Sequence, residues 1–204
     1  MAQGIQIAKT WEQRWLLSAT LRCRWLQSLV FAVAILVALP GRSAEPVTKE
    51  YQLKAAFLYN FTKFVDWPTN RLGNQNDPIR IGVLGNNPFG EELAKAVEGR
   101  TQNGHPFLVT NLTAATEAAT VHLLFVPRGQ EAALEVVAAD AGLLTVGESE
   151  AFAQQGGVIT FTMEAEKIRF EINLDAAEKG GLKISSRLLQ LAKVVRHKPS
   201  PGSP

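Results

Sequence analysis

The chain is poor in the residue types that build disulfide frameworks and metal sites. Its 204 residues include one cysteine, Cys23, and three histidines, His105, His122 and His197. No two of these histidines have a ligand-like spacing, so we expect no metal ion. His122 falls within an apolar segment, which favours a hydrogen-bonded core histidine over a ligand.

Catalytic and phosphate-binding motifs are also absent. Ser185 and Ser186 stand at an expected helix start without a G-x-S-x-G elbow, so they are interpreted as capping residues. The segment Gly85–Gly90 joins a strand to a helix, but its spacing matches neither a dinucleotide loop nor a Walker loop. Glu91 and Glu92 follow it and would repel a phosphate. We therefore expect a turn here, no cofactor and no enzymatic activity.

Residues 1–44 lack the apolar length that a membrane span needs and have the order of a secretory signal peptide. Basic residues come first, an apolar run from Leu29 to Leu39 follows, and small residues lead to Ala44. A spanning helix takes about 20 apolar residues, and this run is shorter. We expect export to the periplasm with cleavage near Ala44. An uncleaved membrane anchor is the alternative, because Arg42 stands where a small residue is preferred.

The rest of the chain has no large excess of charge of either sign. Five of the 21 Lys and Arg and one of the 19 Asp and Glu lie in residues 1–44, so the remainder carries 16 against 18, a net charge of −2. Nothing in this balance favours nucleic acid as a partner. Cys23 also lies in the leader, so the exported domain cannot form a disulfide and depends on its core for stability.

What the sequence does contain is an alternation of strand-like and helix-like segments. Val121–Val126 is almost wholly apolar, which is typical of a central strand covered on both faces. The alternation favours a single α/β domain over residues 45–197, with a mostly parallel sheet and helices on both faces. Residues 198–204 are expected to be a disordered tail. The expected elements are helices at 48–64, 91–98, 130–139 and 152–155, and strands at 79–84, 107–112, 121–126 and 143–146.

We expect the sheet to end in an antiparallel hairpin followed by a helix. Val158–Met163 and Ile168–Leu174 are β-rich runs separated by four residues. After the glycine pair at 180–181, apolar residues recur at helical spacing, which predicts an amphipathic C-terminal helix. These apolar positions are Ile184, Leu188, Leu191, Ala192 and Val195.

The end of the first helix offers a candidate partner-binding surface. Tyr59, Lys63 and Trp67 lie four residues apart, on a face that flanks the apolar stripe. Such an amphipathic surface is typical of interfaces, and a helix end packed on the sheet is the alternative. Phe89 is a further candidate anchor, because a Pro-Phe-Gly turn at a loop tip has little structural use for a large apolar ring. The residues expected to face the core are Leu53, Phe57, Phe61 and Phe64.

A candidate ligand pocket lies along the second hairpin strand. Arg169, Glu171 and Asn173 alternate with apolar residues and therefore share the polar face of that strand. If a helix covers this face, the three groups must pair or meet a ligand. We expect a coupled Arg169–Glu171 pair; a pocket that also uses Asn87 is the alternative.

Five ordered motifs resemble the YfiR family of periplasmic repressor proteins. They are FLYNFTKFVDWP, IRIGVLGNNPFG, LLTVGE, FEINLDAA and GLKISSRLLQLAKVV, within a match from about Glu50 to Arg196. The resemblance implies a regulator that binds the periplasmic sensor domain of an inner-membrane diguanylate cyclase and holds it inactive, which lowers cyclic di-GMP and biofilm formation. A sensor kinase as receptor and a homodimer stay open. The sequence departs from well-known members in lacking the cysteines whose disulfides matter there, so redox control is not expected to carry over.

A solute-binding protein is the alternative from a different functional class. Its ligand would lie beyond the carboxyl ends of the parallel strands, near Gly85–Gly90, Pro127–Gln130 and Gly147–Ser149. The sequence contains no signal that identifies such a ligand.

Overall fold

Strands and helices alternate along the chain as the sequence pattern predicts. The computed structural model describes residues 49–68, 70–74, 76–137 and 141–195, all within Glu45–Pro204, the second of two compact units. The signal peptide expected over residues 1–44 and the tail expected over 198–204 lie outside the described residues. In the part of the chain that the structure describes, no helix is both long and apolar enough to cross a membrane.

Among the described residues, one long helix comes first, and short helices and strands follow it. The helices are α2 (Lys49–Lys63), α3 (Glu92–Val97), η1 (Ala115–Thr120), α4 (Ala133–Val137), α5 (Glu150–Gln154), α6 (Leu174–Lys179) and α7 (Ser186–Leu189). The strands are β1 (Val65–Asp66), β2 (Ile79–Leu84), β3 (Thr101–Gln102), β4 (His105–Leu112), β5 (Leu123–Val126), β6 (Leu144–Gly147), β7 (Ile159–Glu164), β8 (Lys167–Asn173), β9 (Lys183–Ile184) and β10 (Lys193–Val195).

Eight strands form one sheet in the order β10-β8-β7-β6-β5-β2-β4-β3. Its pairs are parallel except β7 with β8 and β3 with β4. β5 lies between β2 and β6, with Leu123 opposite both Ile81 and Leu144, and it is buried at every position. The predicted central strand is therefore confirmed, and so is the antiparallel hairpin, in which Phe161 lies opposite Phe170.

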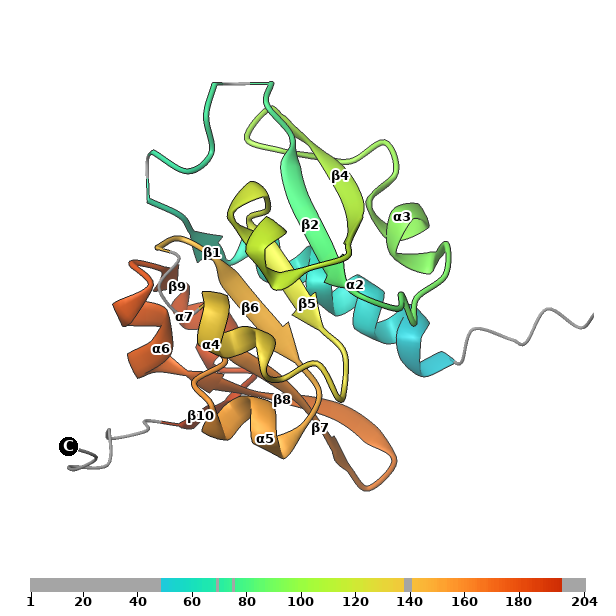
Figure 1. Ribbon diagram of the computed structural model, residues 1–204, viewed down its shortest axis with the longest axis vertical. Helices are drawn as coiled ribbons and strands as arrows, with labels where there is room; N and C mark the ends of the chain where they lie inside the picture. Colours follow the sequence, from blue (N-terminus) through green and yellow to red (C-terminus); the bar gives the residue numbers. More distant parts are fainter. Residues whose placement is uncertain (1–48, 69, 75, 138–140, 196–204) are drawn as a thin grey trace, which may run out of the picture. The chain divides into compact units, whose positions relative to one another are not determined.

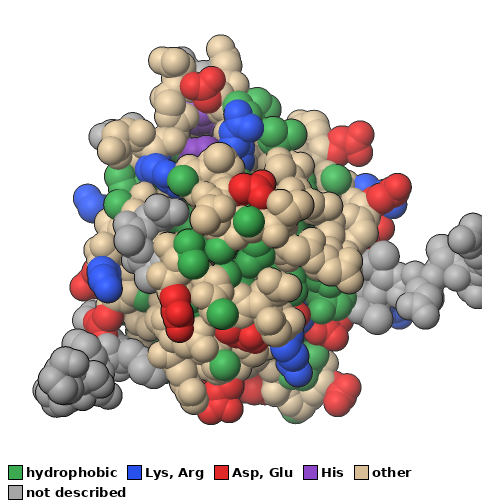
Figure 2. All heavy atoms as spheres, viewed as in Figure 1, with side chains coloured by type: hydrophobic (Ala, Val, Ile, Leu, Met, Phe, Trp, Pro, Cys, Tyr) green, Lys and Arg blue, Asp and Glu red, His purple; other side chains and the backbone are tan. Residues whose placement is uncertain are grey.

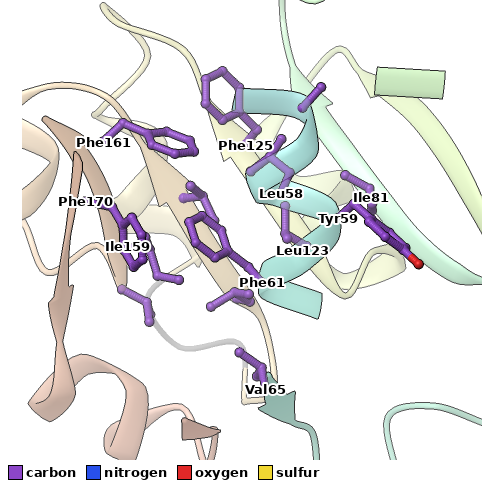
Figure 3. Packing of buried hydrophobic residues seen from close by; sticks show 14 of the residues in the cluster. Leu58, Tyr59, Phe61, Val65, Ile81, Leu123, Phe125, Ile159, Phe161 and Phe170 are labelled. Atoms are coloured by element: carbon purple, nitrogen blue, oxygen red, sulfur yellow. The ribbon is translucent and has the colours of Figure 1, made fainter. Parts of the chain in front are cut away.

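Helices cover both faces of the sheet, as predicted (Figure 1). On the face covered by α2 and α3, the ring centroid of Phe61 lies 5.7 Å from that of Phe161 and 5.0 Å from that of Phe170 (Figure 3). On the other face, residues of η1, α4 and α5 form a second hydrophobic cluster, in which Phe152 is fully buried. On the side seen in Figure 2, cations and carboxylates are interspersed around hydrophobic side chains near the middle.

α2 turns a different face to the core than its apolar spacing predicts. Phe61 is fully buried as expected, but Leu53 is 48% exposed and Lys54 only 5% exposed. Lys54 can be buried because two carboxylates, those of Glu50 and Glu148, pair with its ammonium group. The expected core position of Leu53 is therefore wrong.

The predicted C-terminal amphipathic helix is also wrong. The segment forms β9, one turn of helix α7 and then β10. Ile184 pairs antiparallel with Val65, and Val194 pairs in parallel with Ile172. These long-range strand pairings override the helical spacing, because the β-branched residues fit the pleated sheet. The expected cap is confirmed at Ser185, whose hydroxyl accepts a hydrogen bond from the backbone of α7.

Candidate partner-binding surface

The structure separates the three residues predicted at the end of α2. Lys63 is exposed, but Trp67 is 7% exposed and its indole N–H donates to the His122 carbonyl at 3.3 Å. α2 ends at Lys63, so Trp67 does not lie one helical turn further along the same face. The expectation that Trp67 belongs to an exposed surface is wrong. Trp67 is packed inside the protein, which agrees with the alternative that the end of the helix packs on the sheet.

Phe89 is buried rather than exposed at a loop tip. Its ring is 0% exposed and packs edge-on against Phe125 at 4.8 Å and Tyr51 at 5.4 Å between centroids. The side-chain oxygen of Asn87 accepts a hydrogen bond from the Phe89 N–H at 2.9 Å. This contact helps to fix the turn that directs the ring inward, so the expected surface anchor is corrected to a core residue.

The hairpin residues do not form the expected coupled pair. Glu171 binds Lys193 of β10 at 2.6 Å, while Arg169 is exposed. Asn173 is buried, and its side chain caps α6 by accepting a hydrogen bond from the Ala176 N–H at 3.1 Å. The predicted Arg169–Glu171 pair is wrong because β10, whose strand pairing was not expected, supplies a nearer cation.

Tyr59 and Lys63 do meet, and a third residue joins them. Lys63 Nζ lies 4.6 Å from the centroid of the Tyr59 ring, and the guanidinium carbon of Arg100 lies 4.6 Å from the same centroid. The ring of Phe107 packs edge-on against Tyr59 at 5.4 Å. Tyr59 as a whole is only 7% exposed, so it belongs to the core, although Figure 3 shows its hydroxyl pointing away from the core. Helical spacing places Tyr59 beside Lys63, whereas Arg100 comes from the loop after α3.

The two cations beside Tyr59 are not neutralised. Hydrogen bonding with Arg100, and then with Lys63, lowers the pKa of the Tyr59 hydroxyl, although burial works in the opposite direction. Within the described ranges, neither Lys63 nor Arg100 forms a salt bridge. Two like charges held beside one ring repel each other, so an incoming carboxylate would find a favourable potential here.

A groove of 760 Å³ begins at Arg100 and Phe107 and runs between α3 and β4. The groove is lined by apolar residues from both elements, and Leu108 is 41% exposed. Lys95 also lines it, but Glu91 and Glu92 pair with its ammonium at 3.3 and 3.2 Å. The apolar lining residues are Ala94, Val97, Pro106, Phe107, Leu108 and Val109.

One wall of this groove is a strand with an open edge. β2 pairs with Phe107–Leu112 on one side, and on the other side β3 pairs with His105 and Pro106 alone. Beyond these two residues, the described chain places no strand against that edge of β4. β4 contains no Asp, Glu, Lys or Arg, which commonly protect a sheet edge from further pairing, and its one proline, Pro106, lies where β3 already pairs. The surface therefore combines an apolar groove, free backbone groups and unpaired cations.

The carboxyl ends of the parallel strands, proposed from the sequence as a solute site, carry an internally paired cluster instead. Glu148 and Lys54 side chains are 8% and 6% exposed, and Glu148 Oε2 lies 2.5 Å from Lys54 Nζ. Tyr51 donates to Glu148 at 3.3 Å, and the Arg128 N–H donates at 3.4 Å. Burial would lower the pKa of Lys54, but its hydrogen bonds with Glu148 and Glu50 raise it. A ligand here would have to displace these partners.

His122 is the hydrogen-bonded core histidine that the sequence predicts. Its Nδ1 accepts from the Arg80 N–H at 2.9 Å, so its Nε2 donates to the Arg71 carbonyl at 2.9 Å. Burial lowers its pKa. Among the residues that the structure describes, no three His, Cys, Asp or Glu side chains gather where they could hold a metal ion.

The fold and this surface define an α/β protein with an apolar groove beside an open strand edge. Comparison with known families identifies the chain further: residues 51–193 match the family described as YfiR/HmsC-like, so the chain belongs to that family. No curated protein sequence matches the chain.

Two solved structures show a weak likeness. A conserved domain protein from Vibrio cholerae O1 biovar El Tor strain N16961 is 14% identical with a TM-score of 0.42, and the match covers 73% of this chain and 60% of that one. The ABC domain in complex with L-Trp from Streptococcus pneumonia is 14% identical with a TM-score of 0.38, covering 62% and 57%. The chain thus spans less than two thirds of either protein, and these likenesses carry no argument about function.

Proposed function

We propose that this protein is exported to the periplasm and represses an inner-membrane signalling receptor, a diguanylate cyclase in the first instance, by binding its periplasmic sensor domain. The observation that carries the proposal is the family match over residues 51–193. A sensor kinase is the second receptor class, and neither receptor requires the protein to catalyse a reaction. Repression would lower cyclic di-GMP and biofilm formation.

The groove between α3 and β4, with Tyr59, Lys63 and Arg100 at one end, is the surface that we assign to the receptor. Arginine is enriched among residues that dominate binding energy, and Tyr59, which is 7% exposed, supports the two cations from below. Standard interfaces bury about 800 Å² on each partner, so the contact would extend beyond the groove itself. Trp67 and Phe89 are buried and are not assigned to this surface.

Repression then needs a difference in affinity between two receptor states. A protein that bound the active and the inactive sensor domain equally tightly would not change the ratio of the two states. A shift of the receptor equilibrium by a factor of ten requires the inactive state to bind more tightly by about 1.4 kcal/mol. One or two charge-assisted contacts at Lys63 and Arg100 are strong enough to supply this difference in binding free energy.

Complementation of a gene deletion tests the proposal. Deletion should raise cyclic di-GMP, and the wild-type gene should lower it again. Arg100→Glu should fail to lower it and should no longer co-purify with the receptor, because reversing the charge repels the carboxylate that the surface attracts. Arg169→Glu is the matched control, since Arg169 is an exposed arginine that does not line the groove, and it should complement fully.

A different result would replace the proposal. If deletion changes neither cyclic di-GMP nor the output of any neighbouring sensor kinase, the repressor function fails. The solute-binding alternative would then take its place, and binding of small molecules to the purified protein would become the next measurement.

A further inference from the structure

We infer that the groove takes an extended, acid-bearing segment of the partner, which adds as a strand to the open edge of β4 and places a carboxylate near Lys63 and Arg100. This inference rests on the proposed function in that the receptor supplies the segment. It adds the chemistry of the bound segment and the place of its acidic residue, which neither the family nor the fold specifies.

The backbone of β4 provides the first part of the argument. The Gly85 N–H, just after β2, donates to the Leu112 carbonyl at 2.8 Å, which directs the Leu112 backbone toward β2. Neighbouring residues of a strand direct their backbone groups to alternate sides. Val109 and Asn111 therefore present their N–H and C=O groups to the open edge, and an added strand would satisfy them. This is how extended peptides bind to sheet edges in other proteins.

The groove lining provides the second part. In an added strand, alternate side chains point to one face. Side chains on the face toward α3 would enter the groove beside Ala94, Val97 and Val109, which are apolar and partly exposed except for the buried Val97. Aliphatic residues at every second position of the bound segment fit this surface.

Charge places the acidic residue of the segment. Glu91 and Glu92 pair with Lys95, whereas Arg100 forms no salt bridge in the described chain, although the exposed carboxylate of Glu98 also lines the groove. Lys63 contacts the same Tyr59 ring as Arg100. An acidic residue of the bound segment would therefore lie at the Arg100 end, with the aliphatic residues following along β4.

A second copy of the chain fits this surface less well. If β4 of two molecules paired, each would present the uncharged strand His105–Leu112 to the other. The cations Lys63 and Arg100 would then remain without a carboxylate from that strand. The acid-bearing segment accounts for the cations and the open edge together, so we assign it as the occupant.

Selection of peptides from a random displayed library on the purified full chain tests the inference without knowing the receptor. Enriched peptides should carry Asp or Glu two residues from an aliphatic residue, before it or after it according to the direction of the added strand. Synthetic versions should bind Arg100→Glu or Lys63→Glu at least about tenfold more weakly, since a charge-assisted contact is lost, and should bind Arg169→Glu as they bind the wild type. Methylating the peptide amides that face β4 should also weaken binding about tenfold, while methylating the alternate amides should not.

Three results would overturn the inference. The first is enrichment of peptides without acidic residues, and the second is equal binding by Arg100→Glu and wild type. The third is a dimer in sedimentation that Val109→Pro dissociates and Arg100→Glu leaves intact, which would make a second copy the occupant.

The two proposals fail separately. If acidic peptides bind the groove but gene deletion leaves receptor output unchanged, the repressor function fails and the peptide-binding surface stands. If deletion raises cyclic di-GMP but no acidic extended peptide binds at β4, the repressor function stands and the proposed occupant is wrong.

Discussion

Two lysines of helix α2 have similar local geometry but opposite surroundings. Lys54 Nζ lies 4.7 Å from the Tyr51 ring centroid, and Lys63 Nζ lies 4.6 Å from the Tyr59 ring centroid. Lys54 is buried and pairs with two carboxylates, each at 2.5 Å. Lys63 is exposed, forms no salt bridge within the described chain and lies beside a second cation, Arg100.

This difference separates a residue that holds the fold together from one available to a partner. A buried charge without its partner is strongly destabilising, so the Lys54 cluster constrains α2 against the loop after β6. An exposed cation is hydrated and contributes little to stability, which leaves its favourable interactions available for binding. The same helix therefore carries both kinds of site nine residues apart.

Removing Glu148 tests the first half of this comparison and should have the largest effect. Glu148→Ala leaves the buried ammonium of Lys54 with Glu50 as its remaining carboxylate, and should lower the free energy of unfolding by about 3–5 kcal/mol. Lys54→Ala should be similarly destabilising. Urea denaturation of the purified variants measures both.

The double variant Lys54→Met with Glu148→Leu shows whether the two residues act as a pair. Its loss of stability should be smaller than the sum of the single losses, because no unpaired charge remains buried. Losses that add to within about 0.5 kcal/mol would mean that the residues contribute independently, and the comparison with Lys63 would lose its basis.

The sequence predicted the sheet well because its signals are local. The apolar run over Val121–Val126 and the alternation in Ile168–Leu174 each identify a strand without reference to the rest of the chain. The C-terminal segment failed for the opposite reason. Its apolar spacing favours a helix, and only the distant strands β1 and β8 explain why β9 and β10 form instead.

The candidate surface was half predicted. The four-residue spacing of Tyr59 and Lys63 identified them, but Arg100 comes from a distant part of the chain and was missed. A usable signal was present in Asn103-Gly104, a pair typical of tight hairpins. Both residues have positive φ, 51° and 90°, and the turn pairs β3 with the start of β4. Recognising it would have brought Arg100 to the sheet edge.

The buried charges were harder to predict. Lys54 lies among polar and apolar residues without a pattern that marks it as buried, and its partner Glu148 is 94 residues away. Phe89 was predicted to be exposed and is buried. A turn sequence indicates that the chain reverses, but it does not indicate where the side chains of the turn point. Tertiary packing decided both positions.

The pKa values of the two tyrosines of the chain should show directly how the surroundings of Lys54 and Lys63 differ. Burial and then Glu148 raise the pKa of Tyr51, whereas hydrogen bonding with Arg100 lowers that of Tyr59. Ultraviolet titration of the folded protein should therefore show two separate ionisations, one on each side of the ordinary value of about 10. Arg100→Gln should raise the lower of the two pKa values and leave the higher one unchanged. A single transition, or no response to Arg100→Gln, would contradict the arrangement around Tyr59.

Neutralising the exposed cations should have the smallest effect on stability. Lys63→Gln and Arg100→Gln each remove an exposed cation–π contact, which contributes about 1 kcal/mol at most. Each also relieves repulsion between two like charges, which offsets part of that loss. Urea denaturation should therefore place both variants within about 1 kcal/mol of the wild type, well apart from Glu148→Ala. A loss as large as that of Glu148→Ala would show that Lys63 and Arg100 hold the fold together, and the surface that we assign to the receptor would have to lie elsewhere.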